Sequence, residues 1–467
     1  MVDQHDPLVA HGVLKQGGAV MNAVATPRAT TVGGAQRTVR RLIVYGLLFA
    51  LVTIGAIGLS GLLARLLEAG TELAVNDVTG LAQSLAFTLI GGPLAALLWL
   101  AVWRRLGDDA ERSSLAWGLY LSGVYAVSLI TFTVSLVATG SSLVNGAWQP
   151  RDFATGIVWA GVWVWHRWMS RHPARRPARL VTVPVVIGSA YGLVIGVGGA
   201  VTALGSLLDT AIRGTADQAV GDPWWQPIVR SLLWAVTGAA IWWWHWIHDD
   251  VRRVRTGFAN VALVVLGILG AGVLTLGGLG TILFVLLRLA FDRTDPITEI
   301  VDSLGGAIAA AAIGALVWFY HRRVSRGRRA DTRQAATLVT SGIGLVAAAT
   351  GIGIIVNSLL ATVGTPLAGS DPRTLLLGGI SALVVGGPVW WLVWRPVAPA
   401  EPVEMASTGR RVYLVAVFGL SAIVALIALL VVGYRIFEFL LDSATAGGLV
   451  ERVRAPLGLL VAAGLAL

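Results

Sequence analysis

Long apolar segments, separated by short charged or turn-forming stretches, follow one another along nearly the whole chain. Many of them extend over 20 or more residues without a charged side chain, which is the length that an α-helix needs to cross a bilayer. The pattern predicts an all-α fold, a polytopic helical membrane bundle of about twelve spans. Two of the predicted spans, at about 153–168 and 228–246, are rich in tryptophan and contain a histidine near the end.

A tryptophan-rich motif ends every second predicted span, and a charged stretch follows it. Aligned on their first shared tryptophan, successive copies lie 64, 79, 76 and 72 residues apart. The aligned residues are Trp99, Trp163, Trp242, Trp318 and Trp390. This regular spacing indicates an internal repeat. Each repeat is interpreted as a hairpin, in which a long glycine-rich helix is followed by a loop and by a second helix that ends in the tryptophan motif.

The repeat divides the chain into a polar tail and six hairpins. Residues 1–37 are predicted to form a disordered cytoplasmic tail. The hairpins are predicted at 38–109, 110–176, 177–253, 254–333, 334–404 and 405–467. Residues 462–467 align with the residues just before Trp318, so the sixth hairpin is expected to be truncated within its second helix.

Charge predicts how the hairpins are oriented. The side that holds the amino terminus and the loops after the tryptophan motifs has one lysine and 24 arginines against 10 acidic residues, a net charge of +15. The opposite side has 10 arginines and 15 acidic residues, a net charge of −5. Positively charged loops stay inside, so the amino terminus and the tryptophan motifs are predicted at the cytoplasmic face. All hairpins then insert into the membrane in the same orientation, as parallel repeats.

Composition narrows the class of protein further. With 56% apolar and 13% charged residues and a mean hydropathy of +0.76, the chain is too apolar for a soluble globular protein. It contains no cysteine, which excludes disulfides, thiolate metal sites and cysteine nucleophiles. The net charge of +10 comes from arginines at helix ends, where topology and lipid headgroups explain them, so nucleic acid is not an expected partner. The expected partners are the lipid bilayer and proteins that bind the basic inner loops, and oligomeric state is left open.

Three histidines occupy the same position of the motif, three residues after the aligned tryptophan. They are His166, His245 and His321, and the first and fifth copies have Val102 and Val393 there. The favoured interpretation is an amphipathic ring among tryptophans at the headgroup level. The alternative is cofactor binding: if the hairpins surrounded a common axis, the imidazoles could converge on a haem iron or another metal.

The tryptophans of the motif share one face of their helix. They are interpreted as anchors at the membrane interface, and an aromatic cage for a quinone or a cation is the alternative. The predicted anchors are Trp99, Trp103, Trp163, Trp242, Trp246, Trp318, Trp390 and Trp394. Recurring glycines in the long helices, such as Gly192, Gly196, Gly277 and Gly344, are interpreted as helix-packing positions.

The ends of the hairpins resemble the bacterial family DUF5671, a domain of unknown function. The resemblance lies in the basic–aromatic entries, from Arg40 to Tyr45 and from Arg410 to Tyr413, and in the exit from Trp242 to Trp246. It implies a tandem-hairpin protein of the bacterial cytoplasmic (inner) membrane. It implies no activity, because none is known for the family.

Candidate chemistry is sparse, so no catalytic residue, metal site or cofactor is predicted, and the protein is not expected to be an enzyme. Ionisable groups are almost absent from the centres of the predicted spans, which argues against proton-coupled transport. The favoured function is a structural or interaction component of the membrane. The alternatives are a carrier or channel for a neutral or lipid-like solute, along the axis between repeats, and a haem- or quinone-binding electron-transfer subunit. If the protein is a carrier, a polar cavity is expected near mid-membrane. If it is a scaffold, a glycine-packed interior is expected. If it is an electron-transfer subunit, two histidine rings are expected to face each other.

Overall fold

The computed structural model describes residues 31–69, 77–214, 223–363, 372–394, 408–441 and 448–467. The first 30 residues of the predicted tail lie outside these ranges, and the first helix already begins at Thr31. Within the described residues every regular element is a helix.

The helices differ greatly in length. Their bounds are α1 (Thr31–Glu68), α2 (Val78–Ala86), α3 (Gly92–Arg105), α4 (Asp109–Arg112), α5 (Leu115–Val144), α6 (Pro150–Arg171), α7 (Val183–Arg213), α8 (Trp225–Trp243), α9 (Gly257–Ala262), α10 (Ala271–Phe291), α11 (Ile297–Ile300), α12 (Leu304–Arg326), α13 (Ala330–Ala361), α14 (Pro372–Trp394), α16 (Thr408–Leu441) and α17 (Leu449–Ala466). Three π-helical turns continue neighbouring helices, η1 (Phe87–Gly91), η3 (Trp244–His248) and η5 (Leu263–Gly270), and a short 3₁₀ turn, η4 (Val251–Arg253), follows η3.

Nine helical segments of the described residues are long and apolar enough to cross a membrane, so the chain is a multi-pass membrane protein. The predicted number was about twelve, and α6, α8 and α17 are not among the nine. Tryptophan and charged or polar side chains lower the mean hydropathy of α6 and α8, whereas α17 contains Glu451, Arg452 and Arg454. Membrane crossing by these three helices stays a prediction.

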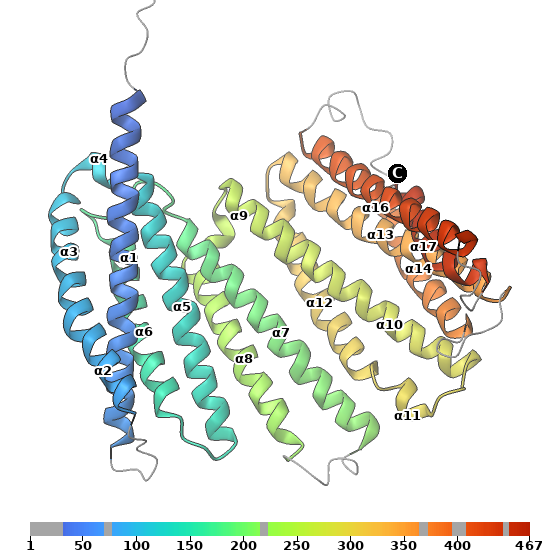
Figure 1. Cartoon of the computed structure of the whole chain (residues 1–467), viewed down its shortest axis with the longest axis horizontal. Helices are drawn as coiled ribbons and strands as arrows, with labels where there is room; N and C mark the ends of the chain where they lie inside the picture. Colours follow the sequence, from blue (N-terminus) through green and yellow to red (C-terminus); the bar gives the residue numbers. More distant parts are fainter. Residues whose placement is uncertain (1–30, 70–76, 215–222, 364–371, 395–407, 442–447) are drawn as a thin grey trace, which may run out of the picture.

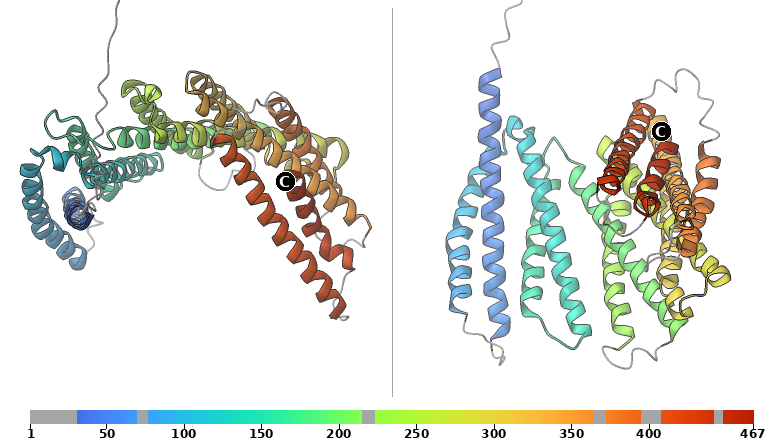
Figure 2. Two further views of the ribbon diagram at one scale, coloured as in Figure 1. Left: turned by 90° about the horizontal axis from the view of Figure 1, so that it is seen from above. Right: turned by 45° about the vertical axis from the view of Figure 1, so that its right-hand side comes forward.

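The helices pack in pairs, namely α1 with α3, α5 with α6, α7 with α8, α10 with α12, α13 with α14, and α16 with α17. These pairs form an open row that follows their order along the chain (Figure 1). Helices α1 and α3 lie at one end of the row, and α16 and α17 lie at the other. Seen from above, the row is curved but does not close (Figure 2). Consecutive helix pairs contact each other through α1 with α6, α5 with α8, α7 with α12, α10 with α14, and α13 with α17. The described helices therefore do not surround a common axis.

Glycines allow close approach of the two helices within a pair. A Cβ atom on Gly192 of α7 would lie 2.9 Å from the carbonyl oxygen of Gly238 in α8, and one on Gly344 of α13 would lie 2.6 Å from the backbone nitrogen of Trp390 in α14. Such contacts between small residues are how helices pack in membranes. The packing role predicted for these glycines is confirmed. Gly277 differs, because a Cβ there would have no atom within 4 Å.

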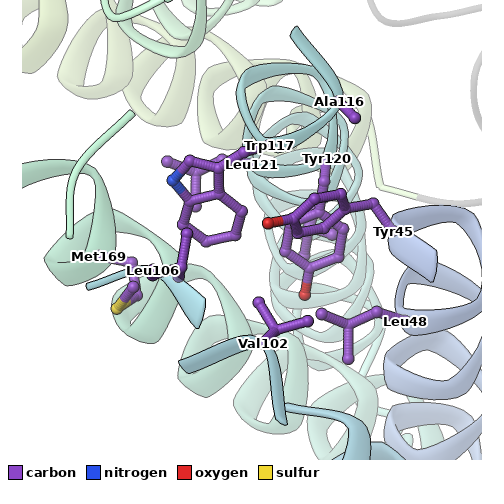
Figure 3. Close-up of a cluster of buried hydrophobic side chains, with 10 residues drawn as sticks. Tyr45, Leu48, Val102, Leu106, Ala116, Trp117, Tyr120, Leu121 and Met169 are labelled. Carbon is purple, nitrogen blue, oxygen red and sulfur yellow. The ribbon is translucent and has the colours of Figure 1, made fainter. Parts of the chain in front are cut away.

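A buried aromatic cluster joins the first two helix pairs. It includes Tyr45 of α1, Val102 of α3, Trp117 and Tyr120 of α5, and Met169 of α6 (Figure 3). The rings of Trp117 and Tyr120 stack with their centroids 5.5 Å apart. Burial of large aromatic rings fixes how these helices cross, because such rings fill the space between them in few orientations.

Candidate functional site

The three histidines of the tryptophan motif are buried and are held in the same way. His166, His245 and His321 expose only 2%, 1% and 2% of their surface. The Nδ1 atom of each lies 2.8 Å from the carbonyl oxygen four residues earlier in its helix. A carbonyl can only accept, so Nδ1 donates and Nε2 is left as an acceptor.

Two tyrosines of α5 donate to two of these Nε2 atoms. The Tyr120 hydroxyl lies 3.1 Å from Nε2 of His166, and the Tyr125 hydroxyl lies 2.6 Å from Nε2 of His245. The ring of His245 also lies against Gly188 of α7, where a Cβ atom would collide with it. Helix α5 is thereby bonded to its own partner helix α6 and to the following helix pair.

The Tyr125 hydroxyl belongs to a larger cluster, here called the Tyr125 network, which consists of Tyr125, Arg167, Arg171, His245 and Asp249. All of these side chains are buried except that of Arg171, which is exposed. Arg167 donates to the Tyr125 hydroxyl at 3.3 Å and to both carboxylate oxygens of Asp249 at 3.0 and 2.9 Å. Arg171 donates to the same carboxylate at 2.5 Å. Bidentate pairs of this kind combine charge with fixed geometry. The network connects α5 and α6 to the segment just after η3.

Aromatic rings surround the guanidinium of Arg167, whose Cζ lies 5.4 Å from the ring centroid of Trp163 and 5.2 Å from that of Trp244. Burial alone would raise the pKa of Asp249. The hydrogen bond and charge of Arg167, together with the charge of Arg171, outweigh that effect and hold the pKa of Asp249 below its usual range. Asp249 is therefore ionised at neutral pH, and both of its carboxylate oxygens accept hydrogen bonds from arginine side chains.

The three histidines do not come together. His166 lies against Tyr120, His245 against Tyr125 and Gly188, and His321 against Gly267 in η5. Among the described residues no ring contact joins two of them, and no group of histidine, aspartate and glutamate side chains there has the arrangement of a metal site. The hairpins do not surround an axis, so the convergence on which the haem hypothesis depended is not formed. A ligand role for a single histidine stays a prediction.

The predicted tryptophan anchors lie mainly between helices. Trp246 is buried, and its indole N–H donates to the Tyr320 hydroxyl at 2.8 Å. Trp103 is half-buried, stacks on Trp168 and has the guanidinium of Arg175 3.8 Å from its ring centroid. Exposed tryptophans lie beside the motif positions and also at the opposite ends of α6 and α8. The former are Trp165, Trp168, Trp243, Trp244 and Trp391, and the latter are Trp148, Trp224 and Trp225. Anchoring by the eight aligned tryptophans stays a prediction.

Comparison with family models confirms the resemblance seen in the sequence. The model described as a domain of unknown function, DUF5671, matches residues 41–165, 182–312 and 334–465, which together make up most of the chain. The chain belongs to the DUF5671 family. No curated protein and no solved structure matches it significantly.

The sequence did not reveal which side chains form hydrogen bonds with the residues of the tryptophan motif. Asp249 is recognisable in the sequence as an acid four residues after His245, and Arg167 directly follows His166, but nothing local connects them. Tyr125 lies 42 residues from Arg167 and 120 from His245 along the chain. Only the packing of α5 against both α6 and the following helix pair brings these groups together.

Three apolar grooves lie between helices of this DUF5671 protein. Their volumes are about 690 Å³ between α10, α13, α14 and α16, about 810 Å³ between α1, α3 and α6, and about 420 Å³ between α7, α8 and α12. A smaller pocket of about 380 Å³ has polar walls and includes Arg65, Asp77 and Arg151. It lies at the ends of α1 and α6 that are remote from the tryptophan motifs. The largest grooves are thus suited to apolar rather than polar molecules.

Proposed function

We propose that this chain is a non-enzymatic structural or interaction component of the bacterial cytoplasmic membrane, with its basic helix ends inside. The observation that supports it is the open row of helix pairs, in which close-packed glycines hold the helices of a pair together and the Tyr125 network joins one pair to the next. A row that does not close leaves the helices at both ends, and both broad faces, available to lipid or to other membrane proteins. The polar groups of the Tyr125 network serve contacts between helices.

The inner ends of the helices offer a basic surface to a partner. Arg323, Arg326 and Arg329, where α12 meets α13, are exposed. Their neighbour Arg328 is buried and donates to the carbonyl oxygens of Arg252 and Val254. Some arginines of this end therefore hold the loops together, while others face outward and complement an acidic partner or anionic headgroups.

A lipid-like solute carrier is the second candidate, and the three apolar grooves favour it. The path of such a solute would run along a groove on the side of the row. It would not run along a central axis, because the described helices enclose none.

Orientation is tested first, by labelling single cysteines. The natural chain has no cysteine, so each introduced thiol is the only one present. With Arg329→Cys we expect reaction with a membrane-impermeant maleimide only after cells are opened, and with Asp295→Cys reaction in intact cells. The reverse pattern would show that the basic ends face outward.

The interaction role is tested by photo-cross-linking in native membranes from a probe placed at Asp331, beside the exposed arginines. We expect discrete cross-linked species that are lost when Arg323, Arg326 and Arg329 are changed to Gln. The matched control changes three arginines of the opposite side, Arg151, Arg213 and Arg293, to Gln and should retain them. An unchanged pattern in the first triple variant would contradict partner binding at this surface.

A further inference from the structure

The groove between α10, α13, α14 and α16 extends along these helices and is open on one side. Its walls run along the end of η5 and along α10, from Leu269 to Phe284, which is about 22 Å at 1.5 Å per residue. Its volume is about 690 Å³. Residues of four helices line it, and nearly all of them are apolar.

Glycines create this groove because they leave its wall without side chains. A Cβ atom on Gly277 or Gly280 would meet no atom within 4 Å, although both residues line the groove. Their neighbour Gly278 faces the other way, and a Cβ there would lie 2.6 Å from the carbonyl oxygen of Ala307 in α12. The glycines of α10 thus serve two purposes, since Gly278 packs against a helix whereas Gly277 and Gly280 leave space open.

The few polar groups of the groove offer little to a polar ligand. The hydroxyl of Ser381 in α14 donates to the carbonyl oxygen of Gly280, so this side chain is already satisfied by the protein. A polar or ionic solute in this groove would lose its hydration without compensating hydrogen bonds. An apolar occupant has no such cost.

We propose that this groove binds an acyl chain of a membrane phospholipid, with the phosphate at the arginine end of α16. Tyr413 lines the groove, and Arg410 and Arg411 precede it in the first turn of α16. Arg411 is exposed, and the guanidinium of Arg410 lies 5.8 Å from the ring centroid of Trp394. A positive charge at one end of an apolar groove complements a phosphate attached to a hydrocarbon chain.

The length and volume of the groove accommodate a lipid acyl chain. Carbon atoms pack about 3.5–4 Å apart, so a single extended hydrocarbon chain fits. The groove also lies beside helices long enough to span the membrane, and it is open on one side, so a bilayer lipid can enter it laterally.

The test is photolabelling in phosphatidylcholine nanodiscs that contain a small fraction of phosphatidylglycerol with a diazirine in one acyl chain. Labelled peptides of the full chain are quantified by mass spectrometry. We expect labelling of the segment 277–284 to fall at least fivefold with Gly277→Leu, and independently with Gly280→Leu, because leucine fills the groove. Gly419→Leu on α16 is the matched control, since Gly419 also has no atom within 4 Å of an added Cβ but does not line the groove.

Equal labelling in the wild type and in both groove variants would overturn the proposal. A dimer that dissociates with Gly277→Leu would also overturn it, because the groove would then be occupied by a second copy of the chain. The headgroup assignment has its own test with a diacylglycerol that has the same labelled chain. We expect the wild type to prefer phosphatidylglycerol and Arg411→Gln to remove that preference, whereas equal labelling of the wild type by both lipids would refute a phosphate contact.

Discussion

Removal of the carboxylate of Asp249 should be among the most destabilising single changes in the chain. The side chains of Arg167 and Asp249 expose only 11% and 2% of their surface, and their two hydrogen bonds measure 3.0 and 2.9 Å. Asp249→Asn leaves the buried guanidinium of Arg167 without a counter-ion. Loss of one partner from a buried ion pair costs about 3–5 kcal/mol, and we expect a value near ~3 kcal/mol because Tyr125 and two indole rings still contact Arg167.

Replacement of both partners by apolar residues separates the cost of an unpaired charge from the value of the pair. The double variant Arg167→Met with Asp249→Leu removes both charges and retains similar volume. Buried pairs replaced in this way are often neutral or stabilising, so we expect a free energy of unfolding within about 1 kcal/mol of the wild type. The expected order of stability is therefore wild type and double variant first, and Asp249→Asn well below them.

The assay is unfolding in mixed micelles by increasing mole fraction of sodium dodecyl sulfate, followed by tryptophan fluorescence. Asp250→Asn is the matched control, because its carboxylate pairs with Arg252 and Arg253 at 3.2 Å but is 43% exposed. Exposed pairs contribute less than about 1 kcal/mol. If Asp249→Asn and Asp250→Asn lose equal amounts of stability, the Tyr125 network does not hold the helices together and the reasoning is refuted.

Three further predictions concern the same helix interfaces. The pKa of Asp249 lies below its usual value of 3.8. The ionised carboxylate therefore contributes its full stabilisation of the folded state above about pH 4 and loses it as the pH falls further. The unfolding midpoints measured at pH 6 and at pH 3 should differ more for the wild type than for Asp249→Asn. Gly192→Ala should lower the free energy of unfolding by about 1–3 kcal/mol, because the new Cβ overpacks against α8. Gly198→Ala should leave the free energy of unfolding unchanged or raise it, because no atom lies within 4 Å of the new Cβ. The same unfolding assay measures both variants. The purified chain should show no Soret absorption, because both ring nitrogens of His245 already have hydrogen-bond partners; a Soret band lost in His245→Ala would instead make the protein a membrane cytochrome.

The sequence by itself determined the helical class, the multi-pass membrane character and the family. The reason is that the bilayer permits a spanning segment very few backbone conformations. Backbone groups in hydrocarbon must be bonded within the segment, so long apolar runs become helices. Glycine spacing is equally local, and it correctly indicated where α7 packs on α8 through Gly192 and Gly196.

Only the tertiary structure decided how the helix pairs are placed and what the motif histidines contact. A repeat of hairpins is compatible with a ring or with a row, because the angle between successive pairs depends on side-chain packing along each interface. That angle placed Tyr125 between Arg167 and His245, and it separated His166, His245 and His321 into different interfaces. Gly277 illustrates the same limit: its sequence context resembles that of the packing glycines, yet the path of α16 and α14 past α10 leaves it beside an open groove.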